Sequence, residues 1–259
     1  MIGIFDSGVG GLTVTSQVIK KLPSKKIIYF GDTARLPYGT KGASFVSKYS
    51  FKITEWLIKK GAKVIIVACH TSSAWASPDL KKKFKKVPIF EMISPSVKEA
   101  AKATRNKRIG IIGTSGTIRS GSYEKELLKL GKFKVYSVAC PLFVPLAEEG
   151  WLKEKTTKEI AYKYLKPLKD KKIDTLILGC THYPLLLWAI RSVFGKTVKI
   201  INPAESLAKE LKNFLDKSSL ILEEGENSYF FSDQPYNFNK ISRNCLKKEI
   251  KIKVKDPFL

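Results

Sequence analysis

The sequence contains no apolar run long enough to cross a membrane. Its longest apolar stretches, such as Val64 to Cys69 and Leu176 to Leu178, have the length of a β-strand, whereas a membrane-spanning helix needs roughly 18 apolar residues. The first residues also lack the basic segment followed by an apolar segment that marks a secretory signal, because a strand-like run, Ile2 to Phe5, begins almost at once. We therefore expect a cytoplasmic protein with no membrane partner.

Cysteine is scarce, with four residues at Cys69, Cys140, Cys180 and Cys245. An even number could form disulfides, but a cytoplasmic chain of 259 residues can bury enough apolar surface to fold without them. Free thiols are therefore expected, and most free thiols pack like small hydrophobic side chains. A functional cysteine must therefore be recognised from its position in the fold and from its neighbours.

Acidic residues are also few, since 23 Asp and Glu stand against 47 Lys and Arg and give a formal charge of +24. Such an excess could mark a nucleic-acid-binding protein. The basic residues, however, are spread in clusters at predicted helix ends and exposed faces, and none forms an arginine and aromatic module of a known RNA-binding type. We interpret them as a solvated surface and expect no nucleic-acid partner.

What the sequence does contain is a repeated alternation of strand and helix. This alternation predicts an α/β fold with mainly parallel sheets flanked by helices. The strand-like runs are continuously apolar and β-branched, which indicates sheets buried on both sides. The expected strands are Ile2–Phe5, Ile27–Phe30, Val64–Ala68, Pro88–Phe90, Ile109–Ile112, Lys134–Val138, Thr175–Leu178, Lys199–Ile201, Tyr229–Phe231 and Ile250–Val254, and helical periodicity marks Ser44–Lys60, Ser72–Phe84, Ser120–Leu130 and Thr156–Leu168.

A weak internal repeat divides the chain into two similar units. Ile2–Gly8 aligns with Ile109–Ser115, and Val64–Cys69 aligns with Thr175–Cys180 at nearly the same offset. Two similar offsets suggest a duplicated, pseudo-symmetric pair of domains, the second covering about residues 95–202. Each copy places one cysteine just past the carboxyl end of a strand, the edge where ligands bind in open α/β sheets. Facing edges would form an interdomain cleft, the preferred position for an active site.

The glycine-rich segment Asp6–Gly11 directly follows the first strand. It resembles a phosphate-binding loop at a helix start, but Thr13 stands where the dinucleotide fingerprint has its third small residue. Asp6 would also repel a phosphate. The loop therefore suits a carboxylate-bearing substrate, with Asp6 free to bind an ammonium or to assist a base. The alternative is a tight turn that caps a helix.

Polar residues follow both cysteines at the matched strand ends. The two segments are Cys69-His70-Thr71-Ser72 and Cys180-Thr181-His182-Tyr183-Pro184. A thiol near a helix N-terminus has a lowered pKa, and a purely structural cysteine would usually have apolar neighbours. We therefore favour a functional role for this pair over a packing role.

Two kinds of site could use these cysteines. One is a zinc site formed by Cys69, His70, Cys180 and His182, although each Cys-to-His spacing is tighter than in usual zinc motifs. The other is an acid/base pair of opposed thiols. Inversion of a carbon centre needs a base on one face and an acid on the other, and the pKa of a thiol can be tuned for both roles. His182 could hold Cys180 as thiolate or return a proton to it, and Asp6 could serve Cys69 likewise.

Two further segments contribute weaker signals. The loop Gly31–Gly39 follows the second strand and is built of turn residues, and Tyr38 and Gly39 could offer backbone donors to a carboxylate. In Cys140–Gly150 the prolines bar a long helix. Glu148 or Glu149 could reach a cleft, or both could be exposed carboxylates near a helix start.

Taken together, these motifs resemble those of the glutamate racemases, the enzymes that make D-glutamate for bacterial peptidoglycan and cell-wall biogenesis. The resemblance runs from Ile2 to about Leu215, and it includes the Phe5–Leu12 loop, both cysteine segments and Gly113 to Thr117. It implies two domains with the tail after Pro203 returning to the first, so that residues 1–94 and 203–259 form one domain and 95–202 the other. The related aspartate racemases share the two-cysteine logic but are less similar in the N-terminal loop.

The resemblance implies racemisation of L-glutamate to D-glutamate without pyridoxal phosphate, metal or any other cofactor. Cys69 would take the proton from the D-isomer and Cys180 from the L-isomer, assisted by Asp6, His182 and Glu148. The family commonly forms homodimers, so a homodimer is expected. The substrate-binding residues that it implies are Asp6, Ser7, Tyr38, Gly39, His70, Thr71, Thr117, Thr181 and His182.

Two positions depart from the family pattern. His70 stands where the family usually has an asparagine that contacts the substrate, and Ser94 stands where a glutamate is usual. An imidazole titrates near pH 6.5, whereas an amide carries no charge. We therefore expect His70 to contact the substrate and to give activity a pH dependence near pH 6 to 7.

Overall fold

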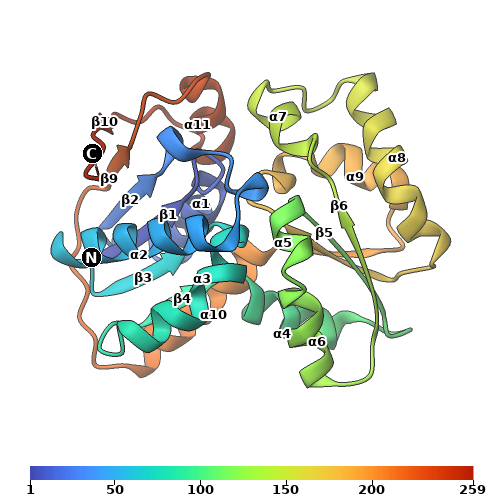
Figure 1. Cartoon of the computed structure of the whole chain (residues 1–259), viewed down its shortest axis with the longest axis horizontal. Coiled ribbons are helices and arrows are strands. Elements are labelled where there is room, and N and C mark those ends of the chain that lie inside the picture. Colours follow the sequence, from blue (N-terminus) through green and yellow to red (C-terminus); the bar gives the residue numbers. More distant parts are fainter. Residues whose placement is uncertain (259) are drawn as a thin grey trace.

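Four strands near the N-terminus and two from the C-terminal segment build a six-stranded parallel sheet within the described part of the chain. The computed structural model describes residues 1–258 (Figure 1). The strand order is β10-β9-β2-β1-β3-β4, and every neighbouring pair is parallel. The bounds are β1 Ile2–Asp6, β2 Ile27–Gly31, β3 Val64–Val67, β4 Ile89–Glu91, β9 Ser228–Phe231 and β10 Lys253–Val254.

The second sheet repeats the arrangement of strands β1 to β4 in the first sheet. Its order is β6-β5-β7-β8, again parallel throughout, and it matches β2-β1-β3-β4 strand for strand. The internal repeat seen in the sequence thus pairs β1 with β5 and β3 with β7. The bounds are β5 Arg108–Gly113, β6 Lys134–Ala139, β7 Thr175–Gly179 and β8 Lys199–Ile201. The expected α/β class with two pseudo-symmetric units is confirmed.

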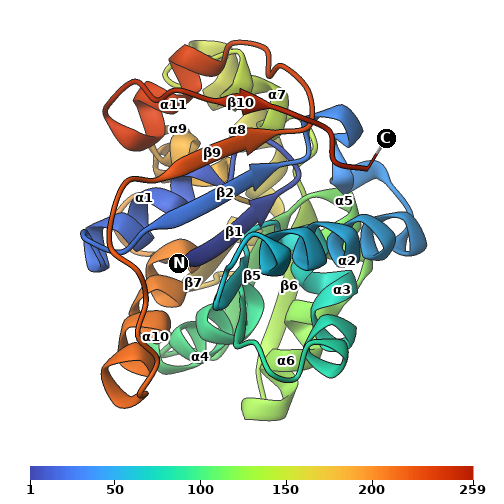
Figure 2. The ribbon, with the colours of Figure 1, turned by 90° about the vertical axis from the view of Figure 1, so that its left-hand side faces the viewer.

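Helices cover both faces of the first sheet, as Figure 2 shows. Ile2 and Ile4 of β1 pack toward one face with α1 and α10, whereas Phe5 packs toward the other. This alternation follows from the twofold period of a strand. The first face is covered by α1 Leu12–Lys21, α10 Pro203–Lys217 and α11 Phe238–Leu246, and the second by α2 Ala43–Lys59 and α3 His70–Lys83.

The second sheet has the same layered arrangement. Ile109 and Ile111 face α4 and α6, whereas Ile112 faces the opposite layer of α7, α8 and α9. A short helix, α5, follows β5 directly. The bounds are α4 Ile93–Ala103, α5 Ser115–Arg119, α6 Ser122–Leu130, α7 Phe143–Glu148, α8 Lys155–Asp170 and α9 Leu187–Phe194, with 3-10 turns at Thr33–Arg35, Tyr38–Thr40 and Tyr183–Leu186.

Several predicted elements differ in their bounds. The helix expected from Ser120 begins at Ser122, because Gly121 before it is left-handed with φ +63° and separates it from α5. The last strand is shorter than the expected Ile250–Val254. The proline-rich segment forms α7, which is six residues long and so agrees with the expectation that its prolines bar a long helix. Pro145 is its third residue, where a helix needs no backbone N–H donor.

The predicted domain boundaries remain a prediction. The strands of the first sheet come from residues 2–91 and 228–254, and those of the second come from 108–201. The predicted boundary after residue 94 falls inside α4, which packs on the second sheet. The chain therefore passes between the units through α4 and α10, two helices that also contact each other.

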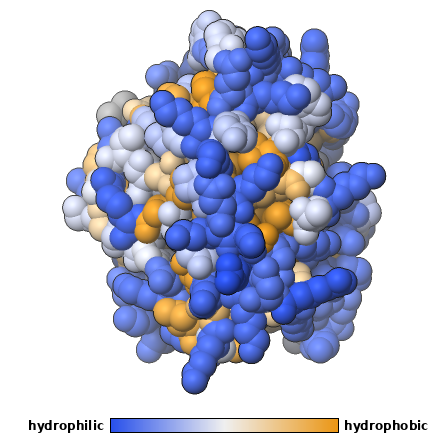
Figure 3. All heavy atoms as spheres, turned by 90° about the vertical axis from the view of Figure 1, so that its right-hand side faces the viewer, coloured by the Kyte–Doolittle hydropathy of each residue, from blue (hydrophilic) through white to orange (hydrophobic). Residues whose placement is uncertain are grey.

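Part of the excess positive charge lies on exposed helix ends. Lys20 and Lys21 close α1, Lys81 to Lys83 close α3, and Lys169 lies in the last turn of α8. A cation is favourable at a helix C-terminus. Figure 3, which views the α8 side, shows hydrophilic side chains over most of that face, with apolar side chains gathered between them. No helix in residues 1–258 is long and apolar enough to cross a membrane.

Gly179 at the end of β7 gives a test of the sheet packing beside Cys180. A Cβ at this position would lie 2.6 Å from the carbonyl oxygen of Ile112 on the neighbouring strand. That oxygen belongs to backbone and cannot move aside cheaply. We expect Gly179→Ala to lower the free energy of unfolding by about 1–3 kcal/mol, the range typical of overpacking. Chemical denaturation measures it. Gly42→Ser is the control, because nothing lies within 4 Å of a Cβ at Gly42, and an equal loss in both variants would contradict the prediction.

Candidate active site

Four strand ends supply the polar residues of the candidate site. Asp6 ends β1, Cys69 lies just past β3, Thr114 follows β5 and Cys180 follows β7. In each sheet the two strands concerned are neighbours, β1 with β3 and β5 with β7. These pairs mark the point where the strand order reverses, which is where ligands bind in open α/β sheets.

The carboxyl ends of the two sheets meet through polar contacts. The Thr13 hydroxyl donates to the carbonyl oxygen of Thr181 at 2.8 Å, and the hydroxyls of Thr71 and Thr117 lie 3.2 Å apart. Asp6 is close enough to His182 for the charge of His182 to act on it. Residues of both units therefore share one buried zone, which contains Asp6, Cys69, Thr71, Thr117, Cys180, Thr181 and His182, each at most 6% exposed as a residue.

Cys69 is the N-cap of α3. Its sulfur accepts the backbone N–H of Ser72 at 3.5 Å, as expected for an acceptor at a helix N-terminus. Burial and then the nearby Asp6 carboxylate raise the pKa of Cys69 to about 11, against weaker opposing hydrogen bonds from Ser72 and Ser7. The lowered pKa expected from its place at a helix N-terminus is therefore wrong for Cys69. At neutral pH Cys69 therefore carries its proton and is able to act as an acid.

Asp6 keeps one oxygen free in this zone. Its Oδ2 accepts the backbone N–H groups of Gly8 and Gly11, both at 3.1 Å. Its Oδ1 is buried and has no hydrogen-bond partner among residues 1–258. Burial raises the pKa of Asp6, against the opposing effects of His182 and the loop N–H groups. A buried oxygen without a partner is costly, and a bound ammonium group would satisfy it.

Cys180 lies beside a histidine that is itself held by a carboxylate. His182 Nδ1 lies 3.8 Å from the Cys180 sulfur, and His182 Nε2 lies 3.0 Å from Glu148 Oε1. Burial disfavours the charged imidazolium, but the hydrogen bonds to Cys180 and Glu148 outweigh it and raise the pKa of His182 to about 10. His182 is therefore a cation at neutral pH and can stabilise a thiolate on Cys180.

Three hydroxyl groups form a cluster where α3 and α5 begin. The hydroxyls of Thr71, Thr114 and Thr117 lie 3.0–3.2 Å from one another. Thr114 also accepts the backbone N–H of Thr117 and so caps α5. Sequence reasoning named Thr71 and Thr117 but missed Thr114. The internal repeat held the signal, because it aligns Thr114 with Ser7.

The Tyr38–Gly39 turn packs against α5 beside this cluster. The hydroxyl of Tyr38 donates to Asp32 at 2.5 Å, and Asp32 also accepts from Arg35 at 2.6 Å. Because its hydroxyl is used in this way, Tyr38 can offer a ligand only its backbone or ring. Gly39 is buried against Thr114, so the turn lies at the point where the two units meet.

His70 has a different environment from the one that the sequence suggested. It is buried at the start of α3, and its Nδ1 lies 2.7 Å from the hydroxyl of Tyr123 on α6, with the two rings stacked. Burial lowers the pKa of His70 to about 3. The expected titration near pH 6 to 7 is therefore wrong, because His70 is neutral throughout that range. Its contact with a substrate remains a prediction, and Tyr123 is a partner that sequence reasoning missed.

A metal centre finds no support in the geometry. Within residues 1–258, no three His, Cys, Asp or Glu side chains are grouped in a way that could hold a metal ion. The proposed zinc ligands His70 and His182 are directed to other partners, namely Tyr123 and Glu148. The four cysteines are free thiols, as expected.

Comparisons with known proteins agree with one another. The family model described as Asp/Glu/Hydantoin racemase matches residues 2–211. A glutamate racemase of Geobacter metallireducens is 45% identical over 249 residues, which are 95% of this chain and 92% of that protein. A glutamate racemase of Aquifex pyrophilus is 45% identical over 254 residues, which are 98% of this chain and 96% of that protein.

Solved structures give the same result. A glutamate racemase of Francisella tularensis in complex with D-glutamate has a TM-score of 0.90 at 34% identity and covers 98% of this chain and 96% of that one. The isoform RacE1 from Bacillus anthracis has a TM-score of 0.93 at 36% identity, with 99% and 97% covered. An aspartate racemase of Picrophilus torridus, at 17% identity and a TM-score of 0.56 over 86% of this chain and 95% of that one, is similar in fold alone.

The two histidines of the chain should titrate far apart. We expect the His182 ring signals in NMR spectra to shift near pH 10, because Cys180 and Glu148 stabilise its charged form. The His70 signals should stay constant from pH 5 to 9, because burial keeps that ring neutral. Because the sequence has two histidines, the spectrum of the His70→Asn variant assigns the ring signals of both. A His70 midpoint near 6.5, the value of an exposed histidine, would contradict the buried environment described above.

Proposed function

The chain belongs to the Asp/Glu/hydantoin racemase family, and we propose that it interconverts L- and D-glutamate with Cys69 and Cys180 as the two acid/base groups. The observation that carries the proposal is the placement of two thiols at equivalent strand ends of two similar units whose carboxyl edges meet. Racemisation needs this arrangement, because the proton must leave one face of Cα and return to the other.

The surroundings of the two thiols support different resting roles. Cys180 lies beside a cationic His182, which can stabilise a thiolate that removes the Cα proton. Cys69 is protonated at neutral pH and can deliver a proton to the opposite face. After one turnover the roles are exchanged, so the reverse reaction uses Cys69 as the base. To reset the pair, one proton must pass from Cys180 to the Cys69 thiolate, and His182 beside Cys180 and Asp6 beside Cys69 would relay it.

Substrate recognition in this proposal uses groups that the structure leaves near the thiols. The free oxygen of Asp6 suits the α-ammonium. The hydroxyls of Thr71, Thr117 and Thr181 suit carboxylate oxygens, as do backbone N–H groups at the starts of α3 and α5. Ser7, Gly39 and the ring of Tyr38 would close the site around the amino acid, and His70 would stand where other members have asparagine.

The remaining expectations form part of the same proposal. We infer a cytoplasmic enzyme that supplies D-glutamate for peptidoglycan, works without a cofactor, and assembles as a homodimer from domains 1–94 plus 203–259 and 95–202. The zinc alternative is not favoured. Two of its four ligands, His70 and His182, contact Tyr123 and Glu148, and no three candidate ligands within residues 1–258 are grouped to hold a metal ion. Aspartate, whose side chain is one methylene group shorter, is the alternative substrate within the family.

Optical activity tests the reaction directly. We expect L-glutamate incubated with the enzyme and a chelator to lose its circular dichroism signal, because two thiols need no metal to move a proton. Solvent deuterium should appear at Cα. Aspartate, tried in parallel, should react far more slowly. A folded enzyme that leaves both amino acids unchanged would refute the proposed function, and activity that chelation abolishes would refute the metal-free mechanism.

Replacement of each thiol tests the two-base mechanism. Cys69→Ser and Cys180→Ser should each reduce racemisation by about 10²–10⁴-fold, the usual contribution of an acid/base group. Each variant should retain exchange of the Cα proton with the isomer that its remaining thiol can deprotonate, which deuterium incorporation from each isomer would reveal. Cys245→Ser is the matched control, because this buried thiol lies in the core with α1 and α11. Full racemase activity in either active-site variant contradicts the mechanism.

A further inference from the structure

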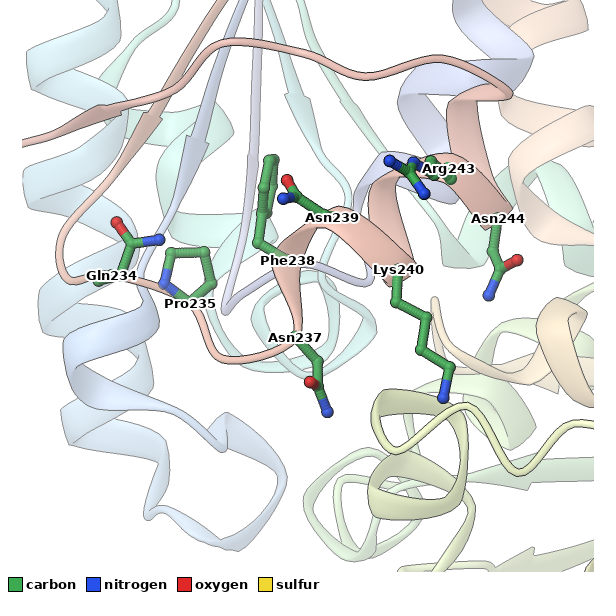
Figure 4. A pocket seen from close by; sticks show the side chains of 8 residues that line it. All are labelled: Gln234, Pro235, Asn237, Phe238, Asn239, Lys240, Arg243 and Asn244. Atoms are coloured by element: carbon green, nitrogen blue, oxygen red, sulfur yellow. The ribbon is translucent and has the colours of Figure 1, made fainter.

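The C-terminal helix α11 contacts the segment that carries Glu148, although the two belong to different units of the fold. The Nζ of Lys240 on α11 donates to the carbonyl oxygen of Glu149 at 2.9 Å. Figure 4 shows the Lys240 side chain extending from α11 toward the yellow-green segment of the second unit, at the edge of a groove of about 700 Å³.

Lys240 projects from a helix that is firmly attached to the first unit. Phe238, Ile241 and Cys245 on the inner side of α11 are buried in the core with α1. Phe238 also packs edge-on against Phe231 of β9, with 5.3 Å between ring centroids. The backbone from which the exposed Lys240 side chain extends is therefore anchored to the first sheet, while its ammonium contacts the second unit.

The receiving turn is shaped for this side chain. Gly150 follows Glu149 and has φ +73°, a conformation that favours glycine. A Cβ on Gly150 would overlap Cε of Lys240 and lie 2.6 Å from its Nζ. The lysine thus lies directly on the backbone of Gly150. It also places a cation at the C-terminal end of α7, where the helix dipole favours one.

Glu148, the last residue of α7, depends on this turn for its position. Its side chain is 29% exposed, so core packing alone does not fix it, and within residues 1–258 its recorded side-chain partner is His182. The backbone of Glu149 is joined to Pro145 on one side and receives Lys240 on the other. Holding the carbonyl of Glu149 therefore restrains the direction in which the neighbouring Glu148 points.

We propose that Lys240 is a positioning residue that holds the turn after α7 so that Glu148 stays on His182, and thereby assists proton transfer at Cys180. The proposal rests on the proposed function for its kinetic consequences. Lys240 touches neither thiol, and its action passes through Glu148. Because the contact joins the first unit to the second, it also forms only when the two units are close together, as they are here.

The first test is Lys240→Met, which keeps the length of the side chain and removes its charge and donors. We expect kcat to fall about tenfold, the effect of losing one charge-assisted hydrogen bond, with KM changed much less. Lys240→Arg should restore most of kcat. Lys248→Met, which removes an exposed lysine of the same segment, is the matched control and should behave as the unaltered enzyme. Circular dichroism and thermal melting check that each variant is folded.

A second readout does not depend on activity. The titratable groups that face His182 are Glu148, Cys180 and Asp6. If Lys240→Met releases Glu148, the NMR titration of His182 should move down by about one pH unit, since each unit corresponds to 1.4 kcal/mol of lost stabilisation. If the unaltered enzyme does not racemise glutamate, the proposed function is wrong. The His182 titration would still test whether Lys240 positions Glu148.

A double-mutant cycle separates positioning from general damage. Glu148→Gln alone should lower kcat, and adding Lys240→Met to it should cost nothing further, because Lys240 acts through Glu148. If the double variant instead loses kcat by the product of the two single-variant factors, Lys240 acts by a route other than Glu148. An unchanged kcat together with an unchanged His182 titration in a folded Lys240→Met variant would overturn the proposal.

Discussion

The contact between the carboxyl ends of two parallel sheets is the constraint on which the rest of this structure depends. Parallel strands direct all their carboxyl ends to one edge, and the reversal of strand order at β1 and at β5 leaves polar residues there. The contacts of Thr13 with Thr181 and of Thr71 with Thr117 bring the two edges together. Two copies of one ordinary ligand-binding edge thus become one site with two opposed faces.

Burial at this contact raises the free-energy cost of every unpaired polar group. The hydrogen-bond partner of each titratable side chain then decides whether that side chain is charged. His70 and His182 are buried alike, yet their pKa values are displaced in opposite directions. His70 faces the neutral hydroxyl of Tyr123, so burial alone determines its pKa of about 3. His182 lies between Cys180 and Glu148, and these partners raise its pKa to about 10. The residue type supplies an imidazole, and the neighbours decide whether it carries a charge.

The same displacements affect stability. His70 binds a proton more readily when the chain is unfolded, so its burial costs stability as the pH falls from about 6.5 toward 3. His182 binds a proton more tightly in the folded state, so its contribution is complete below about pH 6.5 and is lost as the pH rises through about 10. The folded protein therefore loses stability from these two groups at both ends of the pH scale, for opposite reasons.

The sequence by itself determined the α/β class, the strands and the duplicated unit, because these depend on local periodicity and on turn residues at strand ends. It also placed Cys69 and Cys180 at equivalent strand ends, since a repeat in sequence becomes a repeat in topology. Tertiary structure alone decided the partners. Tyr123 lies 53 positions from His70, and Lys240 lies 91 positions from Glu149, so no local pattern could pair them. The charge of each histidine depends on such distant neighbours through burial and hydrogen bonding, and it was therefore decided only by the folded chain.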